Sequence, residues 1–558
     1  MIRLAFAVAL FVLRLPLTLV LYVAGRVRPR RRVLEVVLEG QHPFREKRRS
    51  PFSSRRDGLA RRPLALALKE AEVDAEVEVV FVRMGHLSGA LGELYALRNL
   101  LVSTQAAGKR VVVYLHHPDL RTLWVASAAK EVWVSPHAPL DLTGLALELS
   151  FFGEGLTRLG LGLDVVTAGA FKSAMEPFTR SEPSPENREA LEALLDSLFV
   201  KMVDDISTRP GLTPTALREA LDAGPLLPDE ALSRGLVDAL YEEEAALEAI
   251  GCGPKGRTRR VSAADYSGRR RALPRLGLRR PRLALIEVHG TIRDGKVADD
   301  GSENGATANA VCEALEAARK SRRVKGVLLH VDSRGGSATA SERMFRAVRK
   351  LAEKKPVIAC MGDYAASGGY YVACAAHGIV AAPGTLTGSI GVISAKPVIG
   401  GLLDRIGVSR HALVRGAHAT MSSLSRRYTD EERSRVEAII AHFYALFLRR
   451  VGEGRGRPPE ALAPYAQGRV WTGEQALERG LVDRLGDERV ALAWLSEKTG
   501  LTTDAGFLLF GRKRPLWRRF LPTPGTSTLV EAVDTLSVWA ELEGEPLALS
   551  PIKWRLGR

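Results

Sequence analysis

Cysteine is scarce in this 558-residue chain, and the spacing of its cysteines excludes several kinds of site. The four are Cys252, Cys312, Cys360 and Cys374, and no two of them form a CxxC pair. Neither a disulfide framework nor a zinc site of paired cysteines is therefore indicated. Cys360 and Cys374 lie in apolar runs, where a buried free thiol is the ordinary expectation. No motif in the sequence indicates a metal or an organic cofactor, so we expect none.

Zinc-finger spacing and aromatic–basic RNA-binding motifs are also lacking, although the chain is strongly basic. Lys and Arg number 80 against 64 Asp and Glu, which gives a formal charge of +16. Much of this excess lies in runs outside the patterned segments, at 28–32, 45–49, 257–282 and 512–519. Such runs are typical of solvated arms and linkers, so nucleic-acid binding is only a weak alternative function. A composition of 46% hydrophobic and 26% charged residues is that of a globular protein, and the length favours two domains.

One long apolar run stands at the N-terminus. Residues 4–23 are apolar over about 20 positions, which is enough to cross a bilayer. Arg14 interrupts the run, and an arginine cluster after Gly25 makes a poor signal-peptide cleavage site. The pattern favours a single uncleaved N-terminal anchor or a segment lying in the membrane interface. Because the basic flank follows the run, the positive-inside rule would keep the body of the chain in the cytoplasm.

The chain contains two unequal copies of one pattern. Residues 371–383, YVACAAHGIVAAP, resemble residues 124–136, WVASAAKEVWVSP, at an offset of 371 − 124 = 247. Further along, LTGSIGV resembles LTGLALE, and EQALERGLVDRL resembles DEALSRGLVDAL. In each copy, short β-branched runs alternate with helical stretches, which predicts an α/β fold with mainly parallel sheets. We expect an N-terminal membrane segment with its basic flank at 1–31 and a C-terminal appendage at 501–558. The two copies of the repeat are expected at 32–250 and 283–500, joined by a basic linker at 251–282.

A serine and a lysine are retained reciprocally in the two copies. Ser367 lies in GDYAASGGYY after a strand-like run, and its position in the first copy is 367 − 247 = 120, which is Leu120. Lys172 lies in GAFKSAMEPFTR, and its position in the second copy is 172 + 247 = 419, which is Ala419. This pattern predicts one composite site to which each copy contributes one residue.

The pair has a chemical rationale. A serine hydroxyl attacks a peptide carbonyl only when a base removes its proton, and a lysine acts as that base only when it is neutral. Burial among apolar neighbours would lower the pKa of Lys172 and favour the neutral amine. Histidine is scarce at the required places. His377 follows the serine turn, His418 lies beside the second-copy position that matches Lys172, and no segment proposes a Ser-His-Asp triad.

Two further groups fit the same site. A glycine turn, VDSRGGS, follows the strand-like run 327–331, and we expect the amides of Gly336 and Gly368 to form an oxyanion hole. Ser389, in LTGSIGV, is placed to hydrogen-bond and orient Lys172. The aligned first-copy residue is Leu145, so this serine belongs to the active copy.

Together these motifs closely resemble the signal peptide peptidase A, or protease IV, family in its long duplicated form. The resemblance covers roughly residues 30–500. It implies two ClpP/crotonase-like domains, the first bearing the lysine and the second the serine, with Ser367 as nucleophile and Lys172 as general base. It also implies a homotetramer anchored in the cytoplasmic membrane that degrades signal peptides there or just outside it. The side of the membrane on which the catalytic body lies is left open. The resemblance implies that the protein acts in the membrane or just outside it, whereas the basic flank predicts a cytoplasmic body.

The sequence departs from the family pattern at Arg334, which replaces the proline of SPGG and places a charge beside the oxyanion loop. Two other functions remain as alternatives. A crotonase-type acyl-CoA enzyme would share the fold but would not need Ser367 and Lys172 together. A non-catalytic membrane scaffold would keep its function when Ser367 is replaced by alanine.

Overall fold

The computed structural model describes residues 32–44, 59–252, 258–270, 281–295, 305–502, 507–510 and 547–549. The chain divides into two compact units. Unit 1 consists of Met1–Gly144 and Phe199–Arg280, and unit 2 consists of Leu145–Leu198 and Pro281–Arg558. The segment of the first copy that carries Lys172 therefore belongs to the same unit as Ser367. The domain limits expected from the sequence concern the repeat, and they stay a prediction.

Unit 1 is built on a parallel sheet whose strands follow the order β6-β4-β3-β2-β1-β7. Its central strands are rich in valine and are buried on both faces, as parallel sheets require. The strands are β1 (Arg32–Gly40), β2 (Val77–Leu87), β3 (Arg110–Leu115), β4 (Glu131–Val134), β6 (Ala239–Leu240) and β7 (Arg259–Ser262). The helices are α2 (Arg61–Glu72), α3 (Leu91–Ala106), α4 (Leu120–Ala126), α8 (Pro214–Ala223), α9 (Pro228–Ser233), α10 (Glu243–Ala249) and α11 (Ala263–Arg270).

The main sheet of unit 2 repeats this order. Its parallel strands run β18-β14-β13-β11-β8-β19, and β15 with antiparallel β17 extends beside the end of β13. The strands are β8 (Arg282–His289), β11 (Val324–Ser333), β13 (Val357–Ala366), β14 (Gly378–Ala381), β15 (Leu386–Gly388), β17 (Val470–Thr472), β18 (Arg484–Leu485) and β19 (Phe507–Leu509).

The strand positions confirm the duplication. Strands β2, β3 and β4 begin at residues 77, 110 and 131, and β11, β13 and β14 begin 247 residues later, at 324, 357 and 378. The predicted α/β fold with duplicated, mainly parallel sheets is therefore confirmed.

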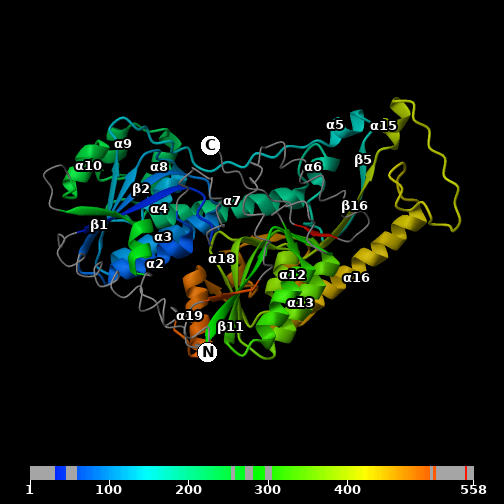
Figure 1. Cartoon of the computed structure of the whole chain (residues 1–558). Helices are drawn as coiled ribbons and strands as arrows, with labels where there is room; N and C mark the ends of the chain where they lie inside the picture. The colour runs from blue at the N-terminus through cyan, green and yellow to red at the C-terminus, as the bar shows by residue number, and fades with distance from the viewer. Residues whose placement is uncertain are drawn as a thin grey trace. The chain divides into compact units, whose positions relative to one another are not determined.

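Helices lie on both sides of the main sheet of unit 2. In Figure 1, α12 (Ala308–Lys320) and α13 (Ala338–Ala352) cover one side, and α19 (Glu488–Thr499) covers the other. A continuous apolar core fills the space between these layers and includes Leu329, Phe345 and Tyr370. The remaining helices are α14 (Gly368–Ala373), α16 (Asp430–Arg455), α17 (Pro459–Leu462), η1 (Ala463–Tyr465) and α18 (Gly473–Glu478).

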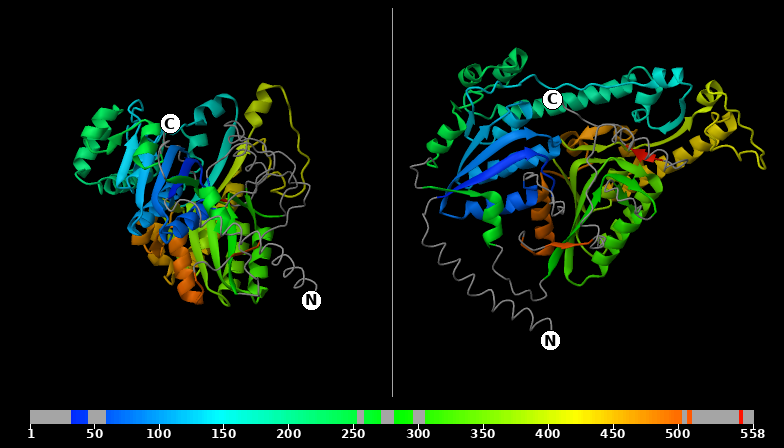
Figure 2. Two further views of the ribbon diagram at one scale, coloured as in Figure 1. Left: turned by 60° about the vertical axis from the view of Figure 1, so that its left-hand side comes forward. Right: turned by 45° about the horizontal axis from the view of Figure 1, so that its top comes forward.

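A second sheet in unit 2 joins the two copies of the repeat. Its strands follow the order β10-β9-β12-β20-β16-β5, and β5 and β16 run side by side toward α5 and α15 (Figures 1 and 2). The strands are β5 (Gly162–Ala168), β9 (Thr291–Arg293), β10 (Gly305–Thr307), β12 (Gly335–Ser337), β16 (Val392–Val398) and β20 (Leu547–Leu549). The helices near β5 and β16 are α5 (Gly153–Arg158), α6 (Glu176–Thr179) and α15 (Gly400–Arg405), and α7 (Pro185–Ile206) continues from unit 2 into unit 1.

No helix within the described ranges is long and apolar enough to cross a membrane. The apolar run at 4–23 that was predicted as an anchor belongs to residues 1–31, which lie outside the described residues.

Candidate active site

Ser367 stands on a sharp turn between a strand and a helix. It follows β13 directly and is the residue before α14, and its backbone has φ 54° and ψ −116°. Its amide donates to the carbonyl of Gly388 at 2.7 Å, which fixes the turn against β15. The side chain is fully buried, so its hydroxyl is shielded from bulk water.

Lys172 reaches this hydroxyl from the loop between β5 and α6. Its Nζ lies 2.8 Å from Ser367 Oγ, 3.0 Å from Ser389 Oγ and 3.1 Å from the Ser389 carbonyl oxygen. The lysine is only 4% exposed, and burial lowers its pKa well below the ordinary 10.5. In the described part of the chain, neither a carboxylate nor a histidine hydrogen-bonds to Lys172 or Ser367. The geometry thus brings together a hydroxyl and an amine that is poised to be neutral.

Backbone strain is concentrated at the same place. Within the described ranges, the non-glycine residues with positive φ are Ser367, Ser389 (φ 50°) and Gln467 (φ 52°), and all three lie at this site. Each costs on the order of 1–3 kcal/mol and persists only where its surroundings hold it in place. Such strained residues are enriched at functional sites, which supports a function for this cluster.

Gln467 belongs to a turn that sequence reasoning did not identify. The Arg469 amide donates to the Ala466 carbonyl across Gln467 and Gly468, which both have positive φ, as in a type I′ turn. On one side, the Phe171 amide donates to the Gln467 carbonyl at 2.8 Å. A Cβ on Gly468 would lie 2.7 Å from Lys172 Cβ, so only glycine lets the lysine loop approach this closely.

The other side of this 466–469 turn holds the strand that carries Ser389. The Ser389 amide donates to the Arg469 carbonyl, and the Gly468 amide donates to the Ile390 carbonyl, both at 2.7 Å. The Arg469 guanidinium lies 4.8 Å from the centre of the Phe171 ring and forms an ion pair with Glu189. The turn therefore fixes the spacing between the lysine loop and Ser389. A glycine turn was readable from the sequence, but its contact with residues nearly 300 positions earlier was not.

The two predicted oxyanion glycines are neighbours. A Cβ on Gly368 would lie 3.1 Å from Gly335 Cα and 3.3 Å from the amide nitrogen of Gly336. The Gly368 amide is the first of α14 and has no carbonyl partner within that helix. Gly336 lies opposite Ile292 of β9 and Ala548 of β20. Arg334 lies between β11 and β12, and its guanidinium is 4.9 Å from the centre of the Tyr364 ring.

Histidine plays no visible part in the described site. His377 Nδ1 accepts from the Val357 amide at 3.1 Å, at the start of β13. His418 lies 3.6 Å from Glu431, on the segment that precedes α16. Neither ring contacts Ser367, so both residues are structural or solvent-facing.

Comparison with family models defines the class of protein. The model for Clp protease matches residues 290–385, and the model for peptidase family S49 matches residues 103–251 and again 349–502. The repeated match coincides with the duplicated parallel sheets described above. The chain is therefore a serine protease with a duplicated ClpP-like fold.

Individual relatives define the family. The chain is 31% identical over 490 residues to the chloroplastic serine protease SPPA of Arabidopsis thaliana, covering 87% of this chain and 71% of that protein. It is 31% identical to Protease 4 of Salmonella typhi, covering 77% of this chain and 71% of the relative. Protease 4 of Haemophilus influenzae is 29% identical over 76% of this chain and 70% of its own length. The chain belongs to peptidase family S49.

Proposed function

We propose that this S49 protease cleaves short apolar peptides, including signal peptides left after secretion, by means of a Ser367–Lys172 dyad. The 2.8 Å contact between Lys172 Nζ and Ser367 Oγ, in a buried setting that lowers the lysine pKa, carries the proposal. We further propose that the protein acts at the cytoplasmic membrane through its N-terminal apolar segment and assembles as a homotetramer.

The first half of the reaction forms an acyl-enzyme. Neutral Lys172 takes the proton of Ser367 as Oγ attacks the peptide carbonyl, and a tetrahedral oxyanion results. The amides of Gly336 and Gly368 donate to that oxyanion, each contributing about 2.7–4 kcal/mol. The Lys172 ammonium then returns its proton to the departing amine as the C–N bond breaks, leaving an ester on Ser367.

The second half releases the acid. Lys172, neutral again, takes a proton from water as the water oxygen attacks the ester carbonyl, and the same amides hold the second oxyanion. The proton then passes to Ser367 Oγ as the ester bond breaks. Ser389 keeps the amine aimed at Ser367 throughout, because both its hydroxyl and its carbonyl contact Nζ.

Hydrolysis of a fluorogenic apolar peptide by the detergent-solubilised chain tests the proposal. We expect cleavage by the wild type and background rates for folded Ser367→Ala and Lys172→Ala. Near-full activity in either variant would remove that residue from the mechanism. An inert wild type that instead binds or turns over a CoA thioester would favour the acyl-CoA alternative.

A further inference from the structure

The C-terminal appendage contributes one strand to the second sheet of unit 2. In the described structure β20 lies between β12 and β16, and it is the short strand drawn in red in Figure 1. It runs antiparallel to both neighbours, with Ala548 opposite Gly336 and Leu547 opposite Ile393. A segment from near the end of the chain therefore fills one position in a sheet whose other strands come from residues 162–398.

The two neighbours of β20 are not paired with each other. The strand order places β10-β9-β12 on one side of β20 and β16-β5 on the other. Because adjacent strands lie about 4.7–4.9 Å apart, the edges of β12 and β16 face each other across a slot that is one strand wide. Each edge presents backbone groups to the slot, so an extended segment can pair with both. The slot therefore suits an extended peptide, and residues 547–549 are such a segment.

Both edges of the slot belong to the candidate active site. Gly336 of β12 is one of the two predicted oxyanion glycines, and a Cβ on Gly368 would lie 3.3 Å from its amide nitrogen. On the other edge, Ser367 Oγ donates to the carbonyl of Gly391 at 3.5 Å, and Gly391 directly precedes β16. A segment in the slot therefore passes between the proposed oxyanion amide and the carbonyl that contacts the serine hydroxyl.

The register places one peptide bond of the segment level with the serine. On β12, Leu549 is opposite Gly335 and Ala548 is opposite Gly336. On β16, the numbers of antiparallel partners have a constant sum, so Leu549 stands level with Gly391, since 547 + 393 − 391 = 549. The bond between Ala548 and Leu549 therefore lies beside the glycines on both sides of the site.

The segment has the composition of the proposed substrates. Its three paired residues read Leu-Ala-Leu, which is a short apolar stretch. Pro546 precedes it and Pro551 follows it, and neither has the amide that a longer ladder would need. The sequence thus limits the segment to a few residues of substrate-like character, held in the same chain as the slot.

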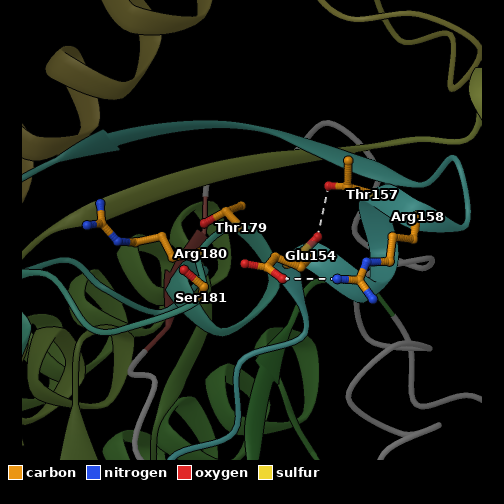
Figure 3. A pocket seen from close by; sticks show the side chains of 7 residues that line it. Glu154, Thr157, Arg158, Thr179, Arg180 and Ser181 are labelled. Carbon is orange, nitrogen blue, oxygen red and sulfur yellow. Dashed lines mark hydrogen bonds and ion pairs between the residues drawn. The ribbon is translucent and has the colours of Figure 1, made fainter.

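The open pocket beside α5 offers no comparable place for an apolar peptide. It measures about 410 Å³, and neither Ser367 nor Lys172 is among its lining residues. Figure 3 shows charged and hydroxyl side chains around it, with Glu154 paired to Arg158 of the same helix. The slot between β12 and β16, by contrast, brings an apolar segment next to the serine.

We propose that residues 547–549 are an internal competitor for the peptide slot between β12 and β16. The segment leaves before a peptide binds, so the apparent affinity for peptides is reduced by the fraction of chains whose slot is open. Because the slot and the segment are in one chain, the competition depends on their effective local concentration and not on the concentration of protein. The inference rests on the proposed peptidase function, which places the substrate in this slot.

Disulfide crosslinking tests the placement without requiring activity. In a Ser367→Ala chain, Ile393→Cys and Leu547→Cys stand opposite each other, where Cα atoms about 4.5–5.5 Å apart allow a disulfide. We expect this pair to close within one chain under mild oxidation, as located by peptide mapping. The matched control is Ile393→Cys/Leu549→Cys, whose Cα atoms would be about 8 Å apart because the second cysteine is two residues out of register. Equal closure in both chains, or none in the first, would overturn the placement.

Binding of a labelled apolar peptide tests the competition. In a Ser367→Ala chain, Ala548→Pro removes an amide from the middle of β20 and should empty the slot. We expect the peptide Kd, measured by fluorescence anisotropy, to fall at least about fivefold. Ala548→Ser keeps the amide, so this control should bind the peptide as the parent chain does. An unchanged Kd in Ala548→Pro would mean that the segment does not compete, and weaker binding by a folded Ala548→Pro chain would mean that it builds the site. Either result would overturn the proposal.

Hydrolysis separates this inference from the proposed function. In chains that retain Ser367, Ala548→Pro should lower KM by the same factor and leave kcat unchanged. If the wild type cleaves apolar peptides with a KM equal to that of Ala548→Pro, the internal competitor is wrong and the peptidase function stands. If no chain cleaves a peptide, yet the disulfide closes and Ala548→Pro binds the peptide more tightly, the peptidase function is wrong and the internal competitor stands.

Discussion

At the residue scale, burial of the Lys172 amine opposes its ordinary charged state. A primary amine buried to 4% exposure is unstable in its charged form, and burial alone lowers its pKa. A lowered pKa favours the neutral amine, which is the form that the proposed mechanism requires as a base. If Lys172 is the base, as proposed, the same burial that limits the stability of the fold serves catalysis.

The pH dependence of kcat/KM should follow from this depressed pKa. Protonation of Lys172 removes the base, so the rate should fall as pH drops through the lowered pKa and reach a plateau above it, well before 10.5. Peptide hydrolysis measured from about pH 5 to about pH 10 checks the profile. A rate that stays flat down to about pH 5 would contradict a lysine base.

Stability should depend on pH in a related way. Between the lowered pKa and 10.5 the unfolded chain binds a proton at Lys172 that the folded chain does not, so this group makes the unfolding free energy rise with pH. Lys172→Met replaces the buried amine with an apolar side chain and so removes the cost of burying an ionisable group. We expect its Tm near neutral pH to exceed that of wild type by about 5 °C. Calorimetry gives the comparison. An equal or lower Tm, with the fold intact, would mean that burial of the amine costs little.

Ser389 should act by aiming the amine. Ser389→Ala removes the 3.0 Å contact to Lys172 Nζ and leaves the carbonyl contact, so we expect kcat to fall about tenfold with little change in KM. Ser423→Ala, which removes a hydroxyl that bonds to Ser425, is the control and should retain full activity. Equal kcat in wild type and Ser389→Ala would assign the orientation of Lys172 to the carbonyl alone.

At the element scale, the 466–469 turn ties the lysine loop to the strand carrying Ser389. Gly468→Ala should displace Lys172, because a Cβ there would lie 2.7 Å from Lys172 Cβ on a backbone with φ 81°. We expect kcat to fall by at least about a hundredfold, since small misplacements of a reacting group are costly. Steady-state kinetics on the folded variant measure the loss.

A second glycine separates this effect from backbone strain. Gly500 has φ 67° and open space around its Cβ position, so Gly500→Ala carries a similar backbone cost without touching the site. It should unfold more easily but retain wild-type kcat. If both alanine variants lost activity to the same extent, strain rather than contact with Lys172 would be responsible.

Much of the element order could be predicted from the sequence, and the reason is the duplication. The offset of 247 that aligned residues 124–136 with 371–383 also separates β2 from β11 and β3 from β13. The same offset indicated that Ser367 and Lys172 belong to one site, and their side chains do meet. Comparing two copies within one chain supplied the long-range information that a single copy lacks.

The 466–469 turn could not be predicted in the same way. Its role depends on which backbone lies against Gly468, and residue patterns describe neighbours along the chain rather than across it. Nor did the repeat indicate that 145–198 would join unit 2, because that assignment follows from the β5–β16 pairing. Register between distant strands is set by contacts of side chains on both, which one-dimensional periodicity does not record.

At the scale of the whole molecule, both members of the proposed dyad lie in one chain and contact each other there. Lys172 and Ser367 both belong to unit 2, so the proposed active site would require no partner chain. Mixing Ser367→Ala chains with Lys172→Ala chains, including cycles of dissociation and reassembly, should therefore leave peptide hydrolysis at background. Recovery of a substantial fraction of wild-type activity would mean that the lysine of one copy serves the serine of another.

The central claim, that Ser367 is a nucleophile activated by Lys172, is tested most directly by trapping the acyl-enzyme. An activated ester is mixed with the wild type and Lys172→Ala, and intact-mass measurement with peptide mapping locates the added acyl group. We predict stoichiometric acylation of Ser367 in the wild type and none above background in Lys172→Ala over the same time. Acylation at another residue, or equally rapid acylation of Ser367 without Lys172, would contradict the account.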